Sequence, residues 1–461
     1  MENNNNGRKV HCLILSFPAQ GHINPMIQFS KILEHQGIRV TFVSTFYYCK
    51  NLHQVPPSIS LETISDGFDQ TGYSGAENYG AYLKHFWEVG PENLGNLVEN
   101  LGRKGHPVDC IVYDGFFPWA LEIAKRFGIV GAAFLTQNMA VNTTYYHLHL
   151  GKVQVPFMEE EFSFPGLPKL DVGDMPSFFF TYAEQPFLLD LLVDQFSNIH
   201  KADWILCNTF YELGKEVNDW TRELWPKYRT IGPNIPSMFL NNQYEDDQDY
   251  GAAAFESEDC MKWLENKPKG SVVYVSFGSL VMVREEQIGE LAYGLRDSNA
   301  YFLWVVRASE QIKLPKDFEN KSEKGLVVTW CPQLKVLAHE AIGCFVTHCG
   351  WNSTLETLCL GVPIVAMPQW SDQNTNAKLI VDLWKIGIRA PVDGNKIVTQ
   401  EALKLCIKEI IESELGKEIK NKMIQWKNFA IRAISEGGSS HENIKEFVNS
   451  LLSQNATCPK V

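Results

Sequence analysis

Two side chains in this sequence, His22 and Asp114, have the types that a base and its partner require. His22 ends the segment Pro18-Ala-Gln-Gly-His22, which follows a short apolar run, and Asp114 follows the apolar run Asp109–Tyr113. A histidine can accept a proton near neutral pH, and a carboxylate on its other ring nitrogen fixes the tautomer and offsets the charge that develops. Since both residues follow predicted strands at one sheet edge, we expect His22 to act as a base oriented by Asp114. The alternative for Asp114 is a plain turn residue.

A second polar group lies in the C-terminal half, in His348-Cys-Gly-Trp-Asn-Ser353. The pattern predicts a strand, a turn at Gly350 and then the start of a helix that carries Asn352 and Ser353. Free backbone N–H groups at a helix start, together with side-chain donors, can hold a phosphate. Taken alone, Asn352 and Ser353 fit an ordinary helix cap better than a phosphate site, because such caps are common.

Two neighbouring segments supply groups that suit a base and a sugar. Trp330-Cys-Pro-Gln333 offers a flat indole beside a proline turn, which can stack on a planar base. Met367-Pro-Gln-Trp-Ser-Asp-Gln373 offers a carboxylate and an amide, which can bind sugar hydroxyls. Groups for a base, a phosphate and a sugar therefore follow one another in Trp330–Gln373.

Positioning these residues requires two sheets. Short apolar runs without alternation predict strands that are covered on both faces, as in parallel sheets. In the first half, the predicted strands are Val10–Ser16, Ile38–Ser44, Asp109–Tyr113 and Ile129–Phe134, with helices at Ile23–Gln36 and about Trp119–Phe127. In the second half, the predicted strands are Ser271–Phe277, Phe302–Val306, Leu326–Thr329, Cys344–Thr347 and Pro363–Ala366, with a helix from near Arg284.

The polar segment Pro233–Ala254 predicts a flexible linker between the halves. We therefore expect an N-terminal domain over residues 1–245 and a C-terminal domain over 246–461. Helical spacing of apolar residues over 421–452 predicts a final amphipathic helix, and residues from about 436 to 461 can pack back on the N-terminal domain. Ligands of such sheets bind at the carboxyl ends of the strands, so facing domains would place the loops 16–22, 114–118, 278–281 and 348–353 in one cleft.

The composition narrows the classes of function. The chain has 461 residues, of which 45% are hydrophobic and 21% charged, which indicates a folded protein rather than a disordered one. Its net charge of −13 argues against a nucleic-acid partner. Eleven cysteines without a C-x-x-C pair indicate reduced thiols. With no apolar run of membrane-spanning length and no signal-peptide pattern, we expect a cytoplasmic protein without integral membrane association, and a monomer.

The segment Trp330–Gln373 resembles, end to end, the signature box of plant family-1 UDP-dependent glycosyltransferases. Pro18-Ala-Gln-Gly-His22 and Phe277-Gly-Ser279 extend the resemblance to both halves of the chain. It implies an α/β fold of two facing Rossmann-like domains (GT-B), each a mostly parallel sheet with helices on both faces. The acceptor would bind in the N-terminal half and the nucleotide sugar in the C-terminal half.

The resemblance also implies a role for each matching residue. Trp330 would stack on uracil, with the Cys331 backbone at the edge of the base, Gln333 near the ribose and Glu356 accepting from the ribose hydroxyls. The residues implied for the diphosphate are Ser279, His348, Asn352 and Ser353, and those for the sugar are Trp351, Asp372, Gln373 and Thr136. His22 and Asp114 match the catalytic base and its partner. A final Gln, as at Gln373, goes with glucose donors.

The implied reaction is inverting transfer of a glucosyl group from UDP-glucose to a hydroxyl or carboxyl of a small lipophilic plant metabolite. The acceptor would be a phenolic, a carboxylic acid, a terpenoid or a steroid, and the product a β-glucoside or a glucose ester. No metal or other cofactor is expected. The residues expected to line the acceptor pocket, each of which could equally be plain core, are Phe117, Tyr146, Phe179, Met282 and Trp370.

Other functions have weaker support. Asp247-Gln-Asp249 has the letters of a metal-binding Asp-x-Asp but lies in the polar linker, and His348-Cys349 has no second ligand pair at zinc spacing. A nicotinamide dehydrogenase would need a G-x-G-x-x-G, which the sequence lacks. A non-catalytic metabolite-binding receptor on the same fold is the remaining alternative. The presence of both His22 and Asp114 argues against it, and release of UDP would decide.

Overall fold

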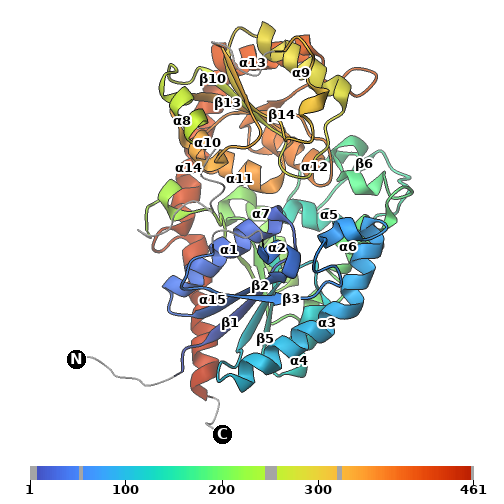
Figure 1. The fold of residues 1–461 in the computed structure, drawn as a ribbon, viewed down its shortest axis with the longest axis vertical. Helices are drawn as coiled ribbons and strands as arrows, with labels where there is room; N and C mark the ends of the chain where they lie inside the picture. The colour runs from blue at the N-terminus through green and yellow to red at the C-terminus, as the bar shows by residue number, and fades with distance from the viewer. Residues whose placement is uncertain (1–7, 51–54, 244–256, 319–323, 458–461) are drawn as a thin grey trace, which may run out of the picture.

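The computed structural model describes residues 8–50, 55–243, 257–318 and 324–457, which form two parallel sheets, one in each half of the chain (Figure 1). The first sheet has the strand order β3-β2-β1-β4-β5-β8-β9, and the second has the order β12-β11-β10-β13-β14-β15. A two-stranded antiparallel hairpin, β6 (Glu161–Phe162) and β7 (Leu170–Asp171), is added to the first half. The predicted α/β class with two parallel sheets is confirmed.

The structure gives the following bounds. The strands of the two sheets are β1 His11–Leu15, β2 Arg39–Thr45, β3 Ser60–Ile64, β4 Cys110–Asp114, β5 Val130–Leu135, β8 Trp204–Cys207, β9 Tyr228–Thr230, β10 Val272–Ser276, β11 Tyr301–Val305, β12 Gly325–Val328, β13 Ile342–Thr347, β14 Ile364–Ala366 and β15 Gly387–Arg389. The α-helices are α1 Gln20–His35, α2 Phe46–Lys50, α3 Tyr79–Arg103, α4 Trp119–Arg126, α5 Met139–His149, α6 Pro186–Asp194, α7 Lys215–Leu224, α8 Ser257–Glu265, α9 Glu285–Asp297, α10 Gln333–Ala338, α11 Trp351–Leu360, α12 Gln373–Lys378, α13 Gln400–Glu412, α14 Glu414–Ile434 and α15 Ser439–Thr457.

Strand β1 shows why its sequence has no polar alternation. Cys12 and Ile14 point to a core cluster shared with α1 and α15, whereas Leu13 and Leu15 point to a cluster shared with α3 and α4. Because successive side chains of a strand point to opposite faces, a strand covered on both faces carries apolar residues at consecutive positions, here from Cys12 to Leu15. The same arrangement in the second sheet places α9, α13 and α14 over one face and α8 and α10 over the other.

The start of the first helix differs from the prediction. We expected it at Ile23, but α1 begins at Gln20, after Ala19 in an extended conformation. The helix has no side-chain cap to mark its start in the sequence. The earlier start places His22 in the first turn of α1.

The C-terminal helical stretch also differs, because it consists of two helices. They meet around Gly437, which has φ +77°, and a side chain at Gly438 would collide with the Arg432 carbonyl oxygen. Helix α15 lies alongside the first sheet, where its Phe447 contacts Phe29 and Trp204 (Figure 1). On α14 the buried stripe runs through Ile419, Met423 and Ala430, and the apolar residues Ile424 and Phe429 of the same helix are exposed.

The predicted linker begins later than expected. Residues 233–237 are buried, since Ile235 belongs to the core cluster formed with α9, α13 and α14, and the Asn234 backbone N–H donates to the Asn208 side chain at 3.0 Å. The domain boundary at 245/246 lies outside the described residues. Among those that are described, no helix has the length and apolarity needed to cross a membrane.

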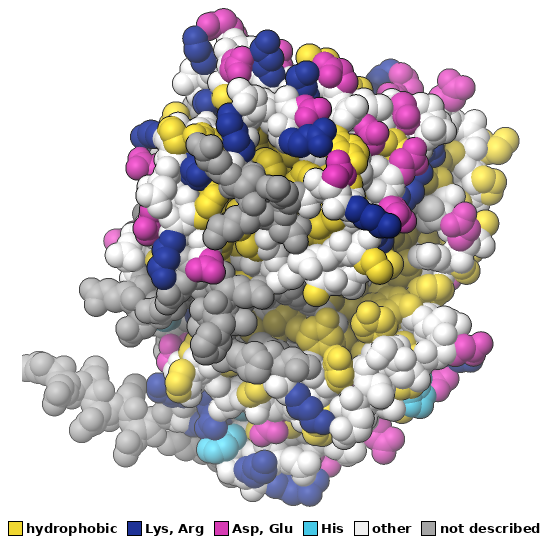
Figure 2. Space-filling model, turned by 45° about the horizontal axis from the view of Figure 1, so that its top comes forward, with side chains coloured by type: hydrophobic (Ala, Val, Ile, Leu, Met, Phe, Trp, Pro, Cys, Tyr) yellow, Lys and Arg dark blue, Asp and Glu magenta, His cyan; other side chains and the backbone are white. Residues whose placement is uncertain are grey.

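Hydrogen bonds join the two halves directly. The Trp351 indole N–H donates to the Asn208 carbonyl at 2.8 Å, and the Trp384 indole N–H donates to the Leu213 carbonyl at 2.9 Å. The Ser177 backbone N–H donates to the Ser371 carbonyl at 2.8 Å. Figure 2 shows apolar side chains gathered in a recess between the upper and lower parts of the molecule.

Candidate active site

His22 and Asp114 meet at the edge of the first sheet. Asp114 is the last residue of β4 and His22 lies in the first turn of α1, which follows the neighbouring strand β1. The His22 Nδ1 donates to Asp114 Oδ2 at 2.7 Å. The other carboxylate oxygen of Asp114 accepts from the Phe116 backbone N–H at 3.0 Å. The carboxylate is 1% exposed and the imidazole 15% exposed, so the pair is rigidly held and the ring still reaches the surface.

Three further side chains surround the imidazole. Thr136 Oγ1 lies 3.2 Å from His22 Nδ1. The rings of Phe17 and Phe116 lie 5.2 and 4.7 Å from the imidazole centroid. Because Asp114 engages Nδ1, the nitrogen that can take a proton from a ligand is Nε2. Phe17 and Phe116 are only 3% and 8% exposed, so they hold the imidazole in place and offer a ligand little surface.

His348 lies at the corresponding edge of the second sheet, between two glycine turns. A Cβ atom at Gly278 would lie 2.9 Å from its ring, and one at Gly350 would lie 2.5 Å from it. Gly278 also has a φ of +73°, which favours glycine. Burial lowers the pKa of His348 to about 4, so its imidazole is neutral at pH 7. A neutral imidazole can donate one hydrogen bond to an anion.

Helix α11 begins beside His348, and the side chains of Asn352 and Ser353 do not cap it. Gly350 is the cap residue and no side chain caps the helix. The Asn352 side chain instead donates to the Gly21 carbonyl at 2.7 Å, which links α11 to the residue before His22. The Ser353 hydroxyl accepts from Gln333 at 3.0 Å. The first backbone N–H groups of α11 thus remain without a side-chain cap, as an anion site requires.

Gln333 organises the group that was predicted to bind a base and a ribose. Its side-chain nitrogen donates to Glu356 at 2.7 Å as well as to Ser353, and its oxygen accepts from the Tyr274 hydroxyl at 3.1 Å. The Tyr274 hydroxyl also lies 3.3 Å from the sulfur of Cys331, whose pKa burial raises to about 12. Trp330, directly before Cys331, is partly exposed. The predicted residues Trp330, Cys331, Gln333, Ser353 and Glu356 are therefore brought together.

Asp372 and Gln373 lie at the start of α12. Asp372 Oδ2 accepts from the Asn376 side chain at 2.7 Å, and burial raises the pKa of Asp372 to about 6. The Gln373 side-chain oxygen accepts from the backbone N–H groups of Gln369 and Trp370 at 2.9 and 2.8 Å. These two bonds assign the oxygen and leave the side-chain NH₂ of Gln373 as the group that can donate to a ligand.

The remaining predicted residues lie in different surroundings. The Trp351 indole is only 4% exposed and joins the two halves of the chain, so it offers a ligand little surface. Ser279 is exposed in the loop after β10. Phe117 and Phe179 are 0% and 1% exposed and lie in the core of the first half, where they present no surface to an acceptor.

Three acceptor-pocket predictions concern partly or fully exposed residues. Tyr146 packs edge-on against Trp225, with 5.0 Å between ring centroids. Trp370 packs edge-on against Phe178 from the first half, and Met282 is 78% exposed. Trp370 is therefore the predicted acceptor residue that the structure places where the halves meet.

Sequence reasoning did not assign a role to Tyr274, Asn376 or Phe17. Tyr274 carries the one hydroxyl in the middle of the apolar segment of β10, which is a readable signal. Asn376 lies one helical turn after Asp372, a spacing at which side chains pair. Phe17 gave no signal, since an apolar residue after a strand usually belongs to the core.

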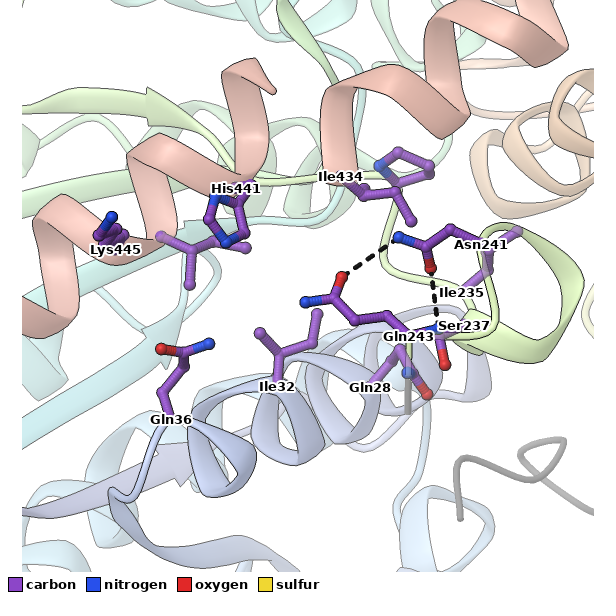
Figure 3. Close-up of a pocket in the computed structure, with 12 residues that line it drawn as sticks. Gln28, Ile32, Gln36, Ile235, Ser237, Asn241, Gln243, Ile434, His441 and Lys445 are labelled. Carbon is purple, nitrogen blue, oxygen red and sulfur yellow. Dashed lines mark hydrogen bonds between the residues drawn. The ribbon is translucent and has the colours of Figure 1, made fainter. Parts of the chain in front are cut away.

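A pocket elsewhere contains none of the predicted site residues. It lies between α1, α15 and the segment before residue 244, and Figure 3 shows Ile32, Ile235 and His441 facing it. Its lining does not gather the groups needed for acid–base chemistry on a sugar donor. Within the described parts of the chain, no group of three or more potential metal ligands occurs, and Asp247 and Asp249 lie outside those parts.

Comparisons with known proteins agree with this arrangement. Residues 223–425 match the family model "UDP-glucoronosyl and UDP-glucosyl transferase". Mogroside I-E synthase from Siraitia grosvenorii is 44% identical over 444 residues, which cover 95% of this chain and 97% of that protein. A flavonol 7-O-beta-glucosyltransferase from Arabidopsis thaliana is 41% identical, covering 96% of this chain and 98% of that protein.

Solved structures agree as well. Os79 from O. sativa in complex with UDP superposes with a TM-score of 0.90 at 35% identity, covering 95% of this chain and all of that one. A UDP-glucose: anthocyanidin 3-O-glucosyltransferase in complex with UDP superposes with a TM-score of 0.85 at 28% identity, covering 97% of this chain and all of that one.

Proposed function

This chain belongs to the plant family-1 UDP-dependent glycosyltransferases, and we propose that it transfers glucose from UDP-glucose to a small lipophilic acceptor with inversion at the anomeric carbon. The observation that carries the proposal is the hydrogen bond of 2.7 Å between His22 and Asp114, next to the residue that Asn352 of the other half contacts. This contact supports a base in one domain that acts beside the start of α11 in the other.

In the proposed reaction, His22 Nε2 takes the proton of the acceptor hydroxyl while its oxygen attacks the anomeric carbon. The bond from that carbon to the diphosphate oxygen breaks, and UDP leaves with the bonding electrons. Asp114 stabilises the imidazolium that forms and keeps Nε2 directed at the acceptor. Attack from the face opposite to UDP converts the α-linked donor into a β-glucoside. No sugar becomes attached to the enzyme.

The donor is proposed to lie along the second sheet. Trp330 stacks on uracil, Glu356 accepts from the ribose hydroxyls, and His348 with the start of α11 receives the diphosphate. These roles are supported by the network that holds Glu356 through Gln333 and by the neutral, closely packed imidazole of His348. The start of α11 and His348 offer hydrogen-bond donors to the diphosphate, and we propose that transfer proceeds without a divalent metal.

Glucose is the proposed sugar. Asp372 accepts from its hydroxyls, and the free NH₂ of Gln373 donates to one of them. This assignment is supported by the bonds from Gln369 and Trp370 that fix the orientation of the Gln373 amide. We expect UDP-glucose to be used in preference to UDP-galactose, and a competition assay that favours galactose would refute the assignment.

The acceptor is proposed to be a flat lipophilic molecule with one reacting hydroxyl or carboxyl. Phe17 and Phe116 make the surroundings of the base apolar, and Trp370, which is partly exposed, lies where the halves meet. The apolar recess in Figure 2 is consistent with such a ligand. Two relatives are named for small metabolites, one for a flavonol and one for a mogroside.

The test is incubation with UDP-glucose, EDTA and a panel of phenols, carboxylic acids, terpenoid alcohols and steroids. Release of UDP together with a matching glucoside supports the proposal. Binding of UDP-glucose and an acceptor without turnover would favour a non-catalytic receptor. Activity that EDTA abolishes and Mn²⁺ restores would overturn the metal-free mechanism.

A further inference from the structure

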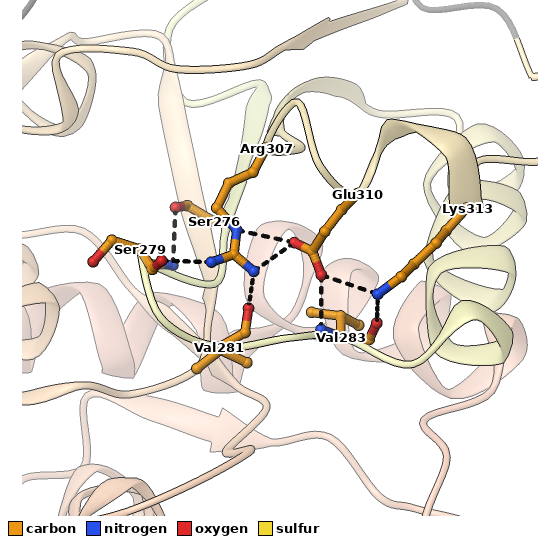
Figure 4. Close-up of polar contacts among 8 residues, drawn as sticks. Ser276, Ser279, Val281, Val283, Arg307, Glu310 and Lys313 are labelled. Carbon is orange, nitrogen blue, oxygen red and sulfur yellow. Dashed lines mark hydrogen bonds and ion pairs between the residues drawn. The ribbon is translucent and has the colours of Figure 1, made fainter. Parts of the chain in front are cut away.

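The loop that carries Ser279 is held by a cluster of three charged side chains. The loop follows β10, whereas Arg307, Glu310 and Lys313 follow β11, which pairs with β10 in parallel. Figure 4 shows the three side chains converging on the loop backbone. Because parallel neighbours end at the same sheet edge, the cluster lies at the edge where His348 and α11 also lie.

Each of the three side chains bonds to the loop. The Arg307 guanidinium donates to the carbonyl oxygens of Ser279 and Val281. One oxygen of Glu310 accepts from the Val283 backbone N–H at 2.9 Å, and Lys313 donates to the Val283 carbonyl at 2.7 Å. The backbone of the loop is therefore bound at three alternate residues.

The cluster is also closed on itself. Glu310 accepts from Arg307 Nε and Nη2 at 3.1 and 2.9 Å, and from Lys313 at 3.3 Å. The Glu310 side chain is 9% exposed, so these charge-assisted bonds are shielded from water. Each of the three nitrogens of Arg307 bonds to Glu310 or to a loop carbonyl. Four of the five guanidinium N–H groups are therefore committed to holding the loop.

The cluster leaves the outer side of the loop free. Val281 and Val283 are buried, whereas Leu280 and Met282 are 54% and 78% exposed. Ser279 is exposed, and the preceding Gly278 is the turn against which the His348 ring packs. A fixed loop backbone therefore fixes both Ser279 and the Gly278 turn beside His348, which belong to the proposed donor site.

We propose that Arg307, Glu310 and Lys313 are positioning residues for the diphosphate of the donor: they hold the loop of Ser279 and the Gly278 turn in the geometry that binds it. This inference rests on the proposed function. It assigns these residues no contact with uracil or ribose, which lie with Trp330 and Glu356. Disruption of the cluster should therefore weaken the binding of UDP and leave the binding of uridine unchanged.

The test compares inhibition by UDP and by uridine against UDP-glucose in the full chain. Arg307→Lys keeps the charge but loses the planar fork that spans two carbonyls and a carboxylate. We expect its inhibition constant for UDP to rise about tenfold while that for uridine stays within about twofold, since one charge-assisted network is lost at the diphosphate alone. Glu310→Gln should shift the ratio in the same direction. Arg296→Lys, the same change on an exposed ion pair of α9, is the control and should leave both constants unchanged.

The outcomes separate the two proposals. If the wild-type protein binds neither UDP nor uridine, the proposed function itself fails. If it binds both, and Arg307→Lys and Glu310→Gln weaken both equally or neither, the positioning role is wrong. If Arg307→Lys is unfolded at the temperature of the assay, Glu310→Gln alone tests the positioning role. The quantity compared is then the ratio of its inhibition constants for UDP and for uridine.

Discussion

The His348 ring packs between Gly278 and Gly350, and a side chain at either position would collide with it. A Cβ at Gly350 would approach the ring to 2.5 Å, although the Gly350 backbone itself, with φ −59°, accepts any residue. Gly350→Ala should therefore displace the imidazole without straining the backbone. We expect the Michaelis constant for UDP-glucose to rise about tenfold, the worth of one hydrogen bond to a charged group.

Gly289→Ala is the matched control for this steric effect. Gly289 lies inside α9, and an added Cβ would meet nothing within 4 Å. It should leave the Michaelis constant unchanged and raise the unfolding midpoint slightly, because alanine favours a helix over glycine by about 1 kcal/mol. An equal rise of the Michaelis constant in both variants would show that His348 is not the group affected.

Asp372 predicts a pH dependence of donor binding. Burial raises its pKa from 3.8 to about 6, so in the free protein it is ionised at pH 7 and mostly neutral at pH 5. An ionised carboxylate accepts from sugar hydroxyls more strongly than a neutral one. Affinity for UDP-glucose should therefore fall as the pH falls through about 6, by up to about tenfold between pH 7 and pH 5.

Calorimetric titration with UDP-glucose between pH 7 and pH 5 checks whether the affinity falls as the pH falls. His348, with a pKa of about 4, stays neutral throughout and adds no slope. Asp372→Asn should bind with an affinity that does not vary over this range. A slope that survives in Asp372→Asn would assign the titration to another group.

Single residues also show where sequence reasoning reaches its limit. Residues of the continuous segment Trp330–Gln373 were assigned to a donor site because their chemistry and order form one pattern, and the structure brings most of them together. Residues chosen only for aromatic character were not: Phe117 and Phe179 are core. Apolar side chains carry no mark that separates a pocket wall from a core, since both avoid water.

At the scale of elements, the helix and strand ends that position His22 and Asp114 differ from the predicted ends by one to a few residues. Helix α1 begins at Gln20 and β4 ends at Asp114, and these two boundaries bring His22 to Asp114. The existence of both elements could be predicted from their apolar spacing. Their ends could not, because α1 has no side-chain cap.

Helix α15 provides an element-scale prediction of stability. Phe447 is fully buried and contacts Phe29 and Trp204, and Arg229 pairs with Glu446 at 2.6 Å. Phe447→Ala should lower the free energy of unfolding by about 3–5 kcal/mol, the usual cost of removing a core phenylalanine ring.

Chemical denaturation measures this loss. Leu452→Ala is the control on the same helix, because Leu452 is 45% exposed and should cost little. Equal, small losses in both variants would mean that α15 is only loosely attached to the first sheet.

At the scale of the molecule, the groups proposed for one reaction lie on opposite sides of a shared boundary. The proposed base belongs to the first half, the groups proposed for the donor belong to the second, and Asn352 bonds across to Gly21 at 2.7 Å. Two parallel-sheet domains were predictable from repeated apolar strands. Which residues join the domains was not, because Asn208, Leu213 and Asp174 contribute through backbone or buried contacts that no local pattern marks.

The central claim is that His22 is the general base, and turnover of His22→Ala with two kinds of acceptor tests it most directly. An alcohol keeps its proton at neutral pH and needs a base, whereas a carboxylic acid is already ionised. The variant should lose about 10²–10⁴-fold in turnover with an alcohol, the usual worth of general-base catalysis, and far less with a carboxylate. UDP affinity and thermal unfolding, measured on the same variant, should match the wild type. Equal losses with both acceptors in a folded protein that still binds UDP would contradict the claim.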